Sequence, residues 1–138
     1  MSGSSSILSY SQDVAEQEAP PPLPTGPYPA EVIGTARKTS QTSGNGYVSV
    51  QFRINADAYP ADFTEGDPDG TVLSYNRLLT DDSPQSRYRM RRFCESIGAK
   101  AGREIDINDW LGLTATIEVG ESEYEGEKRA EIKKVLAP

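Results

Sequence analysis

The chain contains no histidine and a single cysteine, Cys94, among its 138 residues. Without histidine, the sequence excludes histidine-based acid–base catalysis and metal sites built on imidazole. A single cysteine excludes an internal disulfide, and a reducing, intracellular setting is the simpler interpretation. The chain has no run of about 18 apolar residues, so no membrane-spanning helix is predicted. The N-terminus also lacks the basic and apolar regions of a signal peptide.

Motifs for catalysis are absent as well. The sequence has no P-loop, no G-x-S-x-G element and no C-x-x-C pair. The carboxylates of the segment 55–70 lie in a turn-rich stretch, and their spacing does not match a calcium loop. We therefore expect a solvated loop there, no catalysis, no cofactor and no metal site.

Positive charge is in the minority, with 14 Lys and Arg against 21 Asp and Glu, a formal charge of −7. Residues 1–24 contain Asp13, Glu16 and Glu18 and no basic residue, and so contribute −3 of this charge. The acidic balance argues against a protein that coats nucleic acid through its overall charge. It leaves room for a local basic face.

The first 24 residues are predicted to form an extended or disordered arm, followed by one domain over residues 25–138. The arm is rich in serine at its start and in proline at its end, a composition that buries too little to offset its ordering entropy. Ile7, Leu8 and Tyr10 form a small apolar group near its tip. Two interpretations stay open, a disordered leader and a docking arm that becomes ordered on a partner.

Strict alternation over residues 47–54 is the clearest strand signal. Val48, Val50, Phe52 and Ile54 share one face, because successive side chains of a strand point to opposite sides. Further strands are predicted at 27–38, 71–79, 113–119 and 128–136. Turn residues at 40–46 and 124–127 predict two hairpins, and Gly34 and Lys133–Lys134 are expected near bulges.

One helix is predicted between the third and fourth strands. Ser83 suits the N-cap, Pro84 the first helical position and Gly98 the C-terminal stop. An apolar stripe with helical spacing runs through Met90, Phe93, Cys94 and Ile97. Four arginines lie mostly off this stripe, and they form either a second basic surface or a solvated helix face: Arg87, Arg89, Arg91 and Arg92. Cys94 is expected to be buried and inert, and Trp110 to lie in the core or at its rim.

The order of three strands, one helix and two strands predicts a mainly β fold. It fits a five-stranded, OB-type antiparallel barrel whose helix, between strands three and four, closes one end. The alternative is an open antiparallel sheet with the helix across one face.

Four short segments carry a resemblance to a known family. They are Leu23-Pro24-Thr25-Gly26-Pro27-Tyr28, Gly44-Asn45-Gly46-Tyr47, Asp109-Trp110-Leu111-Gly112 and Ala130-Glu131-Ile132-Lys133. Together they resemble a family of small bacteriophage proteins described mainly as a domain of unknown function. The resemblance covers roughly residues 23–138. It implies an OB fold, single-stranded-DNA binding and a link to phage recombination or replication.

Single-strand binding by such a fold uses aromatic rings for stacking and basic groups for phosphates. The candidate DNA-binding residues are Arg37, Lys38, Tyr47, Arg53, Tyr75, Arg77, Tyr124, Lys128 and Arg129. For each, a structural role is the competing interpretation, because tyrosines pack across strands and arginines and lysines pair with carboxylates.

The leading hypothesis is a non-catalytic phage protein that binds single-stranded DNA in replication or recombination, in the host cytoplasm. The alternative is a virion protein for capsid decoration or assembly. In that case the barrel is a packing unit, and Ile7, Leu8 and Tyr10 dock on other phage proteins or capsid subunits. A homo-oligomer is compatible with both.

Overall fold

The strand predicted from the alternation at 47–54 is β2, Gly46–Ile54, in the computed structural model, which describes residues 6–17 and 21–136. Val50, Phe52 and Ile54 are fully buried. The other elements are η1 Val14–Glu16, β1 Gly26–Thr39, η2 Ala56–Ala58, β3 Thr71–Leu79, α1 Pro84–Ile97, η3 Ile107–Trp110, β4 Thr114–Tyr124 and β5 Glu127–Val135.

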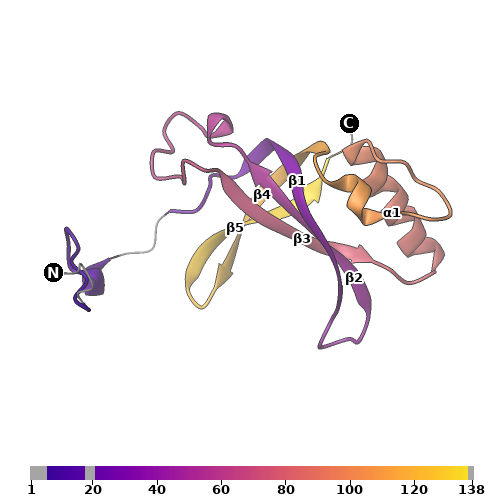
Figure 1. Ribbon diagram of the computed structural model, residues 1–138, viewed down its shortest axis with the longest axis horizontal. Coiled ribbons are helices and arrows are strands. Elements are labelled where there is room, and N and C mark those ends of the chain that lie inside the picture. Colours follow the sequence, from indigo (N-terminus) through magenta and orange to yellow (C-terminus); the bar gives the residue numbers. More distant parts are fainter. Residues whose placement is uncertain (1–5, 18–20, 137–138) are drawn as a thin grey trace.

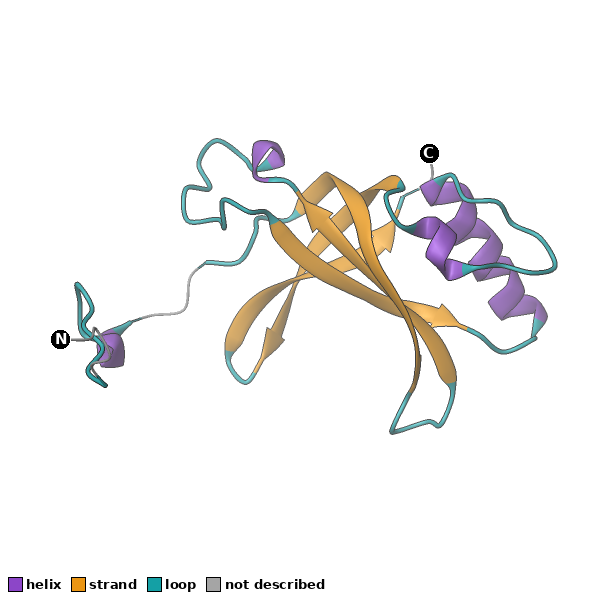
Figure 2. Cartoon of the chain, viewed as in Figure 1, coloured by secondary structure: helices purple, strands orange, loops and turns teal. Residues whose placement is uncertain are grey.

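The five strands form one antiparallel sheet in the order β3-β2-β1-β4-β5, with α1 between β3 and β4 in the sequence. This confirms the predicted mainly β class, the strand number and the place of the helix. The sheet curls so that β3 and β5 come close to each other (Figures 1 and 2). No ladder joins these two strands, so the barrel is loose rather than closed.

Strand β1 is long because it serves two partners. Its first half pairs with β4, with Tyr28 opposite Ile117, and its second half pairs with β2, with Lys38 opposite Tyr47. The register shifts between Val32 and Gly34, which confirms the bulge expected at Gly34. A bulge bends its strand and increases the local twist, which lets one strand contribute to both sides of a curled sheet.

Two further bulges set which side chains face inward. One lies in the β4–β5 ladder opposite Glu118 and Val119, and it confirms the irregularity expected at Lys133–Lys134. The other lies in the β2–β3 ladder, where Val48 opposes Leu78 and Val50 opposes Tyr75. Strand β3 thus has one residue more than β2 in this interval, so Tyr75 and Leu78 both point to the core side.

An aromatic cluster joins α1 to the sheet. The ring of Phe93 lies 6.3 Å from that of Phe52 and 5.1 Å from that of Trp110. Trp110 and Cys94 are buried, as expected. Helix α1 therefore packs its apolar stripe against the open end of the barrel, beside β3 (Figure 1).

The start of the domain extends into the proline-rich segment. Leu23 is buried in the core, and the hydroxyl of Tyr28 donates a hydrogen bond of 2.7 Å to the carbonyl of Pro24. Of the predicted arm, residues 1–5 and 18–20 lie outside the described residues. Residues 6–17 extend away from the barrel (Figure 1) and include one short 3-10 turn.

The helix ends follow the predicted capping pattern. Ser83 accepts a hydrogen bond of 3.2 Å from the backbone N–H of Ser86, and Pro84 begins the helix. Gly98 takes the left-handed conformation at φ 73° and ends it.

Replacing Ser83 by alanine is expected to lower the free energy of unfolding by about 1 kcal/mol, because one backbone N–H loses its side-chain acceptor. Urea unfolding followed by circular dichroism measures this change. Gln85→Ala, an exposed change in the same turn, is the control and is expected to be close to neutral. Equal effects of the two substitutions would contradict the cap assignment.

Candidate nucleic-acid interface

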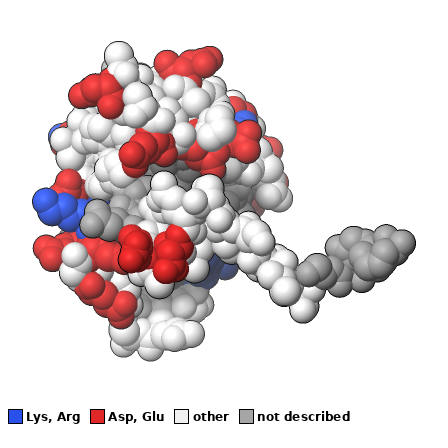
Figure 3. Space-filling view, turned by 90° about the vertical axis from the view of Figure 1, so that its left-hand side faces the viewer, with Lys and Arg blue, Asp and Glu red and all other residues white. Residues whose placement is uncertain are grey.

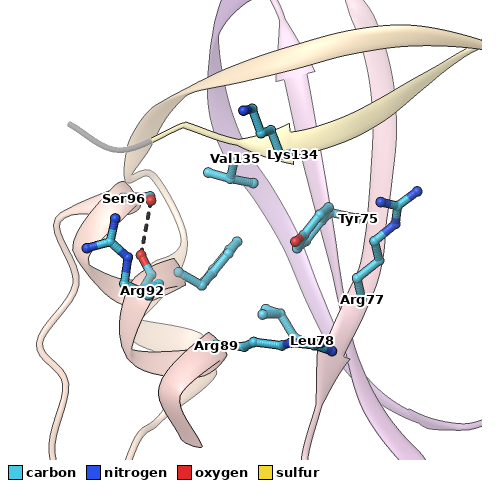
Figure 4. A pocket seen from close by; sticks show the side chains of 9 residues that line it. Tyr75, Arg77, Leu78, Arg89, Arg92, Ser96, Lys134 and Val135 are labelled. Carbon is cyan, nitrogen blue, oxygen red and sulfur yellow. Dashed lines mark hydrogen bonds between the residues drawn. The ribbon is translucent and has the colours of Figure 1, made fainter. Parts of the chain in front are cut away.

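A cleft of about 420 Å³ opens where β3 and the end of β5 face α1 (Figure 4). We call it the basic cleft. Its lining residues are Tyr75, Arg77, Leu78, Arg89, Arg92, Phe93, Ser96, Lys134 and Val135. The volume lies in the range typical of ligand-binding pockets.

Cations dominate the basic cleft, although the protein as a whole is acidic. Arg77, Arg89, Arg92 and Lys134 line it, and no carboxylate does. Arg89 extends from α1 toward β3 (Figure 4), and it forms no ion pair with any residue of the described ranges. The cleft therefore offers a site for an anion with at least one cation not already engaged by a carboxylate.

The other three cations have exchangeable partners outside the cleft lining. Arg92 lies 3.3 Å from Glu95 and Lys134 lies 3.8 Å from Glu118, both at exposed positions. Arg77 donates to the backbone carbonyl of Lys133 at 3.2 Å, a bond that spans the opening between β3 and β5. Exposed ion pairs contribute only about 0–1 kcal/mol, so a phosphate can replace Glu95 and Glu118 as partners at little cost.

An aromatic pair forms one wall of the cleft. The rings of Tyr75 and Phe93 are nearly parallel, with an interplanar angle of 8° and centroids 5.8 Å apart. Tyr75 reaches this position because of the β3 bulge, which the hydroxyl of Ser49 stabilises by donating to the side-chain oxygen of Asn76 at 2.5 Å. The bulge thus turns a strand tyrosine toward the helix.

Burial of the Tyr75 hydroxyl raises the pKa of this residue above its ordinary value of 10.0, while the nearby guanidinium groups of Arg77 and Arg89 lower the same pKa. Burial is the larger effect. The ring is therefore neutral at physiological pH, and two cations lie close enough to its oxygen to influence its titration.

The Tyr75 titration predicts a loss of stability in alkali. The phenol is harder to deprotonate in the folded chain, so its stabilising contribution is present below a pH of about 10 and is lost as the pH rises through the folded pKa. Urea unfolding of wild type and Tyr75→Phe between pH 8 and 11 measures this. The wild type is expected to lose more stability than the variant over that interval, and parallel curves would contradict the assignment.

Of the nine predicted DNA-binding residues, only Tyr75 and Arg77 lie in the basic cleft. Arg37, Lys38 and Tyr47 belong to the β1–β2 hairpin, where Lys38 and Tyr47 are direct cross-strand neighbours and Arg37 opposes Val48. Arg37 and Lys38 are adjacent in one strand and therefore point to opposite faces. None of these three residues lines the basic cleft.

Arg53 lies at the other end of β2, next to the acidic loop. It opposes Glu31 in the sheet, and the two side chains form an ion pair of 3.8 Å. Its Nε atom is buried without a hydrogen-bond partner. Arg53 is therefore paired with a carboxylate, which is the structural role that competes with DNA binding.

Tyr124, Lys128 and Arg129 lie at the tip of the β4–β5 hairpin, well apart from the β1–β2 hairpin (Figure 1). The guanidinium of Arg129 lies 4.9 Å from the centre of the Tyr124 ring, and 3.8 Å separates it from Glu127. Lys128 pairs with Glu121 at 3.6 Å. These cations are engaged locally, within an acidic hairpin.

The arm residues Ile7, Leu8 and Tyr10 are all exposed. The segment 6–17 that carries them leaves the left-hand side of the molecule in Figure 1. Figure 3 shows that side, where Asp and Glu side chains are far more abundant than Lys and Arg. The basic cleft lies beside α1, toward the opposite end of the view in Figure 1.

Sequence reasoning did not assign Arg89, Arg92, Ser96 and Lys134 to a site. Arg89 and Arg92 were recognised only as part of a basic or solvated helix face. Their spacing of three residues, beside the stripe residue Phe93, was the available signal, because it puts both on one flank of the apolar face. No signal of comparable strength pointed to Lys134, whose place depends on the β5 bulge.

Among the described residues, no group of three or more Asp, Glu or Cys side chains could hold a metal ion. No helix in the same ranges is long and apolar enough to cross a membrane. The cations and the Tyr75 ring in the lining of the basic cleft suit an anion that carries an apolar or aromatic part.

Comparison with known proteins gives a family but no function. No curated protein matches the chain. A family model described as "Protein of unknown function (DUF669)" matches residues 10–137, which is nearly the whole chain. The chain therefore belongs to the DUF669 family of proteins of unknown function.

Proposed function

We propose that this chain binds single-stranded DNA without catalysis, with the basic cleft as the centre of the site. One observation carries the proposal. On a protein with a formal charge of −7, four cations and an aromatic pair line one cleft that contains no carboxylate. Phosphates would contact Arg77, Arg89, Arg92 and Lys134, and a base would pack against Tyr75.

The chemistry favours single strands over duplex DNA. A base can reach an aromatic wall only when it is unpaired, and stacking on such a ring contributes about 1–3 kcal/mol per base. The acidic remainder of the protein disfavours long contacts with a duplex backbone. The expected setting, by the family resemblance, is replication or recombination of phage DNA in the host cytoplasm.

Fluorescence anisotropy of a labelled oligo-dT tests the proposal. Binding is expected at low salt and should weaken steeply at moderate salt, because phosphate contacts release counterions. The double variant Tyr47→Ala/Arg53→Ala is the matched control. It removes one ring and one cation outside the cleft and is expected to bind nearly as well as the wild type.

Two results would overturn the proposal. The first is no binding by the wild type at tens of micromolar protein and low salt. The second is loss of binding in the Tyr47→Ala/Arg53→Ala control while the cleft variant Arg89→Glu binds as the wild type does, which would move the site to the outer face of β2.

The alternative function, a virion or assembly protein, is supported by the exposure of the arm. Leu8 and Tyr10 are 76% and 65% exposed and lie away from the barrel core. Apolar side chains in such a position suit docking on a neighbouring subunit. Detection of this chain in purified virions, by mass spectrometry, would favour this function.

A further inference from the structure

The arm and the basic cleft are complementary in both charge and polarity. The arm contains three carboxylates and no cation over residues 1–24, and it exposes the apolar side chains of Leu8, Tyr10 and Val14. The cleft contains four cations, and the apolar part of its lining is partly exposed at Tyr75 and Val135, whereas Leu78 and Phe93 are buried beneath it. An acidic segment with apolar side chains is thus the kind of peptide that the cleft fits.

The arm also has local order that suits a docking segment. Asp13 accepts a hydrogen bond of 2.9 Å from the backbone of Ala15 and caps the 3-10 turn Val14–Glu16. This turn presents Val14 and Glu16 close together, one apolar and one acidic. The family match begins at residue 10, so the family pattern includes this turn.

The position of the arm favours a second molecule as its partner. Residues 6–17 extend from the end of the barrel where β1 starts, whereas α1 and the basic cleft lie at the other end (Figure 1). A contact between the arm of one copy and the cleft of the next uses two different surfaces, so it is heterologous.

We propose that the acidic arm of one copy docks in the basic cleft of a second copy, and that single-stranded DNA competes with it. This inference deepens the proposed function, since it names a competitor for the same cleft, but the docking itself does not require DNA binding. It predicts reversible self-association that weakens with salt and is reversed by oligo-dT.

Sedimentation velocity of the full chain, at low salt and over a range of concentrations, tests the contact. Two charge reversals address its two sides. Asp13→Lys/Glu16→Lys changes the arm, and Arg89→Glu changes the cleft. Each is expected to weaken self-association at least tenfold. Both sets of side chains are exposed, so neither change should unfold the chain.

Glu123→Lys/Glu125→Lys at the β4–β5 tip is the control. It makes the same charge change as the arm variant and should leave association intact.

Mixing the two variants gives a sharper test. The arm variant keeps an intact cleft, and the Arg89→Glu variant keeps an intact arm. Neither should associate alone, but their mixture should form one-to-one dimers that cannot extend further. Dimers in the mixture alone would support the proposal, and their absence would overturn it.

The remaining outcomes are also decisive. A wild type that stays monomeric at all concentrations overturns docking between copies, and a tighter DNA complex of the arm variant would then assign the cleft to the chain's own arm. Association that persists in Arg89→Glu also overturns it. Association as predicted, without any DNA binding, would support docking between copies, and it would reject both the competition by DNA and the proposed function.

Discussion

Replacing Arg89 by glutamate is expected to lower the affinity for oligo-dT by at least about tenfold at low salt, equivalent to about 1.4 kcal/mol. Arg89 lines the basic cleft and has no ion-pair partner in the described part of the chain. Its charge is therefore the one most available to a phosphate, and the reversal adds repulsion. If Arg89 contributes one phosphate contact, the slope of log K against log salt should also fall by about 0.7.

Arg91→Glu is the matched control, because it makes the same charge change on the same helix. Arg91 does not line the cleft and lies 3.7 Å from Glu95. The affinity of the Arg91→Glu variant for oligo-dT, and the salt dependence of that affinity, should stay near those of the wild type. Equal losses in the two variants would mean that the overall charge of α1, and not the cleft, determines binding.

Replacing Phe93 by alanine is expected to lower the free energy of unfolding by about 3–5 kcal/mol, the usual cost of removing a buried phenyl ring. The side chain contacts Phe52, Tyr75 and Trp110, so it joins the helix, the sheet and the cleft wall. This loss is a large part of the about 5–15 kcal/mol that stabilises a typical domain. Urea unfolding followed by the fluorescence of Trp110 measures it.

Tyr88→Ala is the control for Phe93, because Tyr88 is an aromatic residue of the same helix that is 59% exposed. It is expected to change the unfolding free energy by less than about 0.5 kcal/mol. A small effect of Phe93→Ala would show that α1 is not packed on the sheet through this ring.

The parts of the fold that the sequence predicted are those determined by near neighbours in the chain. Alternation in β2, the cap at Ser83 and the glycine at 98 each depend on a few consecutive residues, and each is confirmed. Tyr75 and Arg77 were also identified as candidates, since tyrosine and arginine in a strand are the residue types that bind single strands.

The grouping of the site residues depends on register and docking, which single-sequence patterns do not contain. Arg53 meets Glu31 only because β1 and β2 pair in this register. Tyr75 faces the helix only because β3 has one extra residue opposite Ser49. Lys134 reaches the cleft after a bulge, and Arg89 after the helix docks. The sequence therefore supplied residue types, and long-range pairing decided which of them meet.

The unjoined edges of β3 and β5 have a consequence for aggregation. A strand edge without a partner offers its backbone N–H and C=O groups to any other chain, which is a route to fibrils. Strand β5 contains lysine at three of its nine positions, Lys128, Lys133 and Lys134. Lysines on an edge discourage a further strand from pairing, because its addition would desolvate and crowd their charges. Lys134 therefore has two roles: it lines the basic cleft, and it disfavours pairing of the open edge of β5 with another chain.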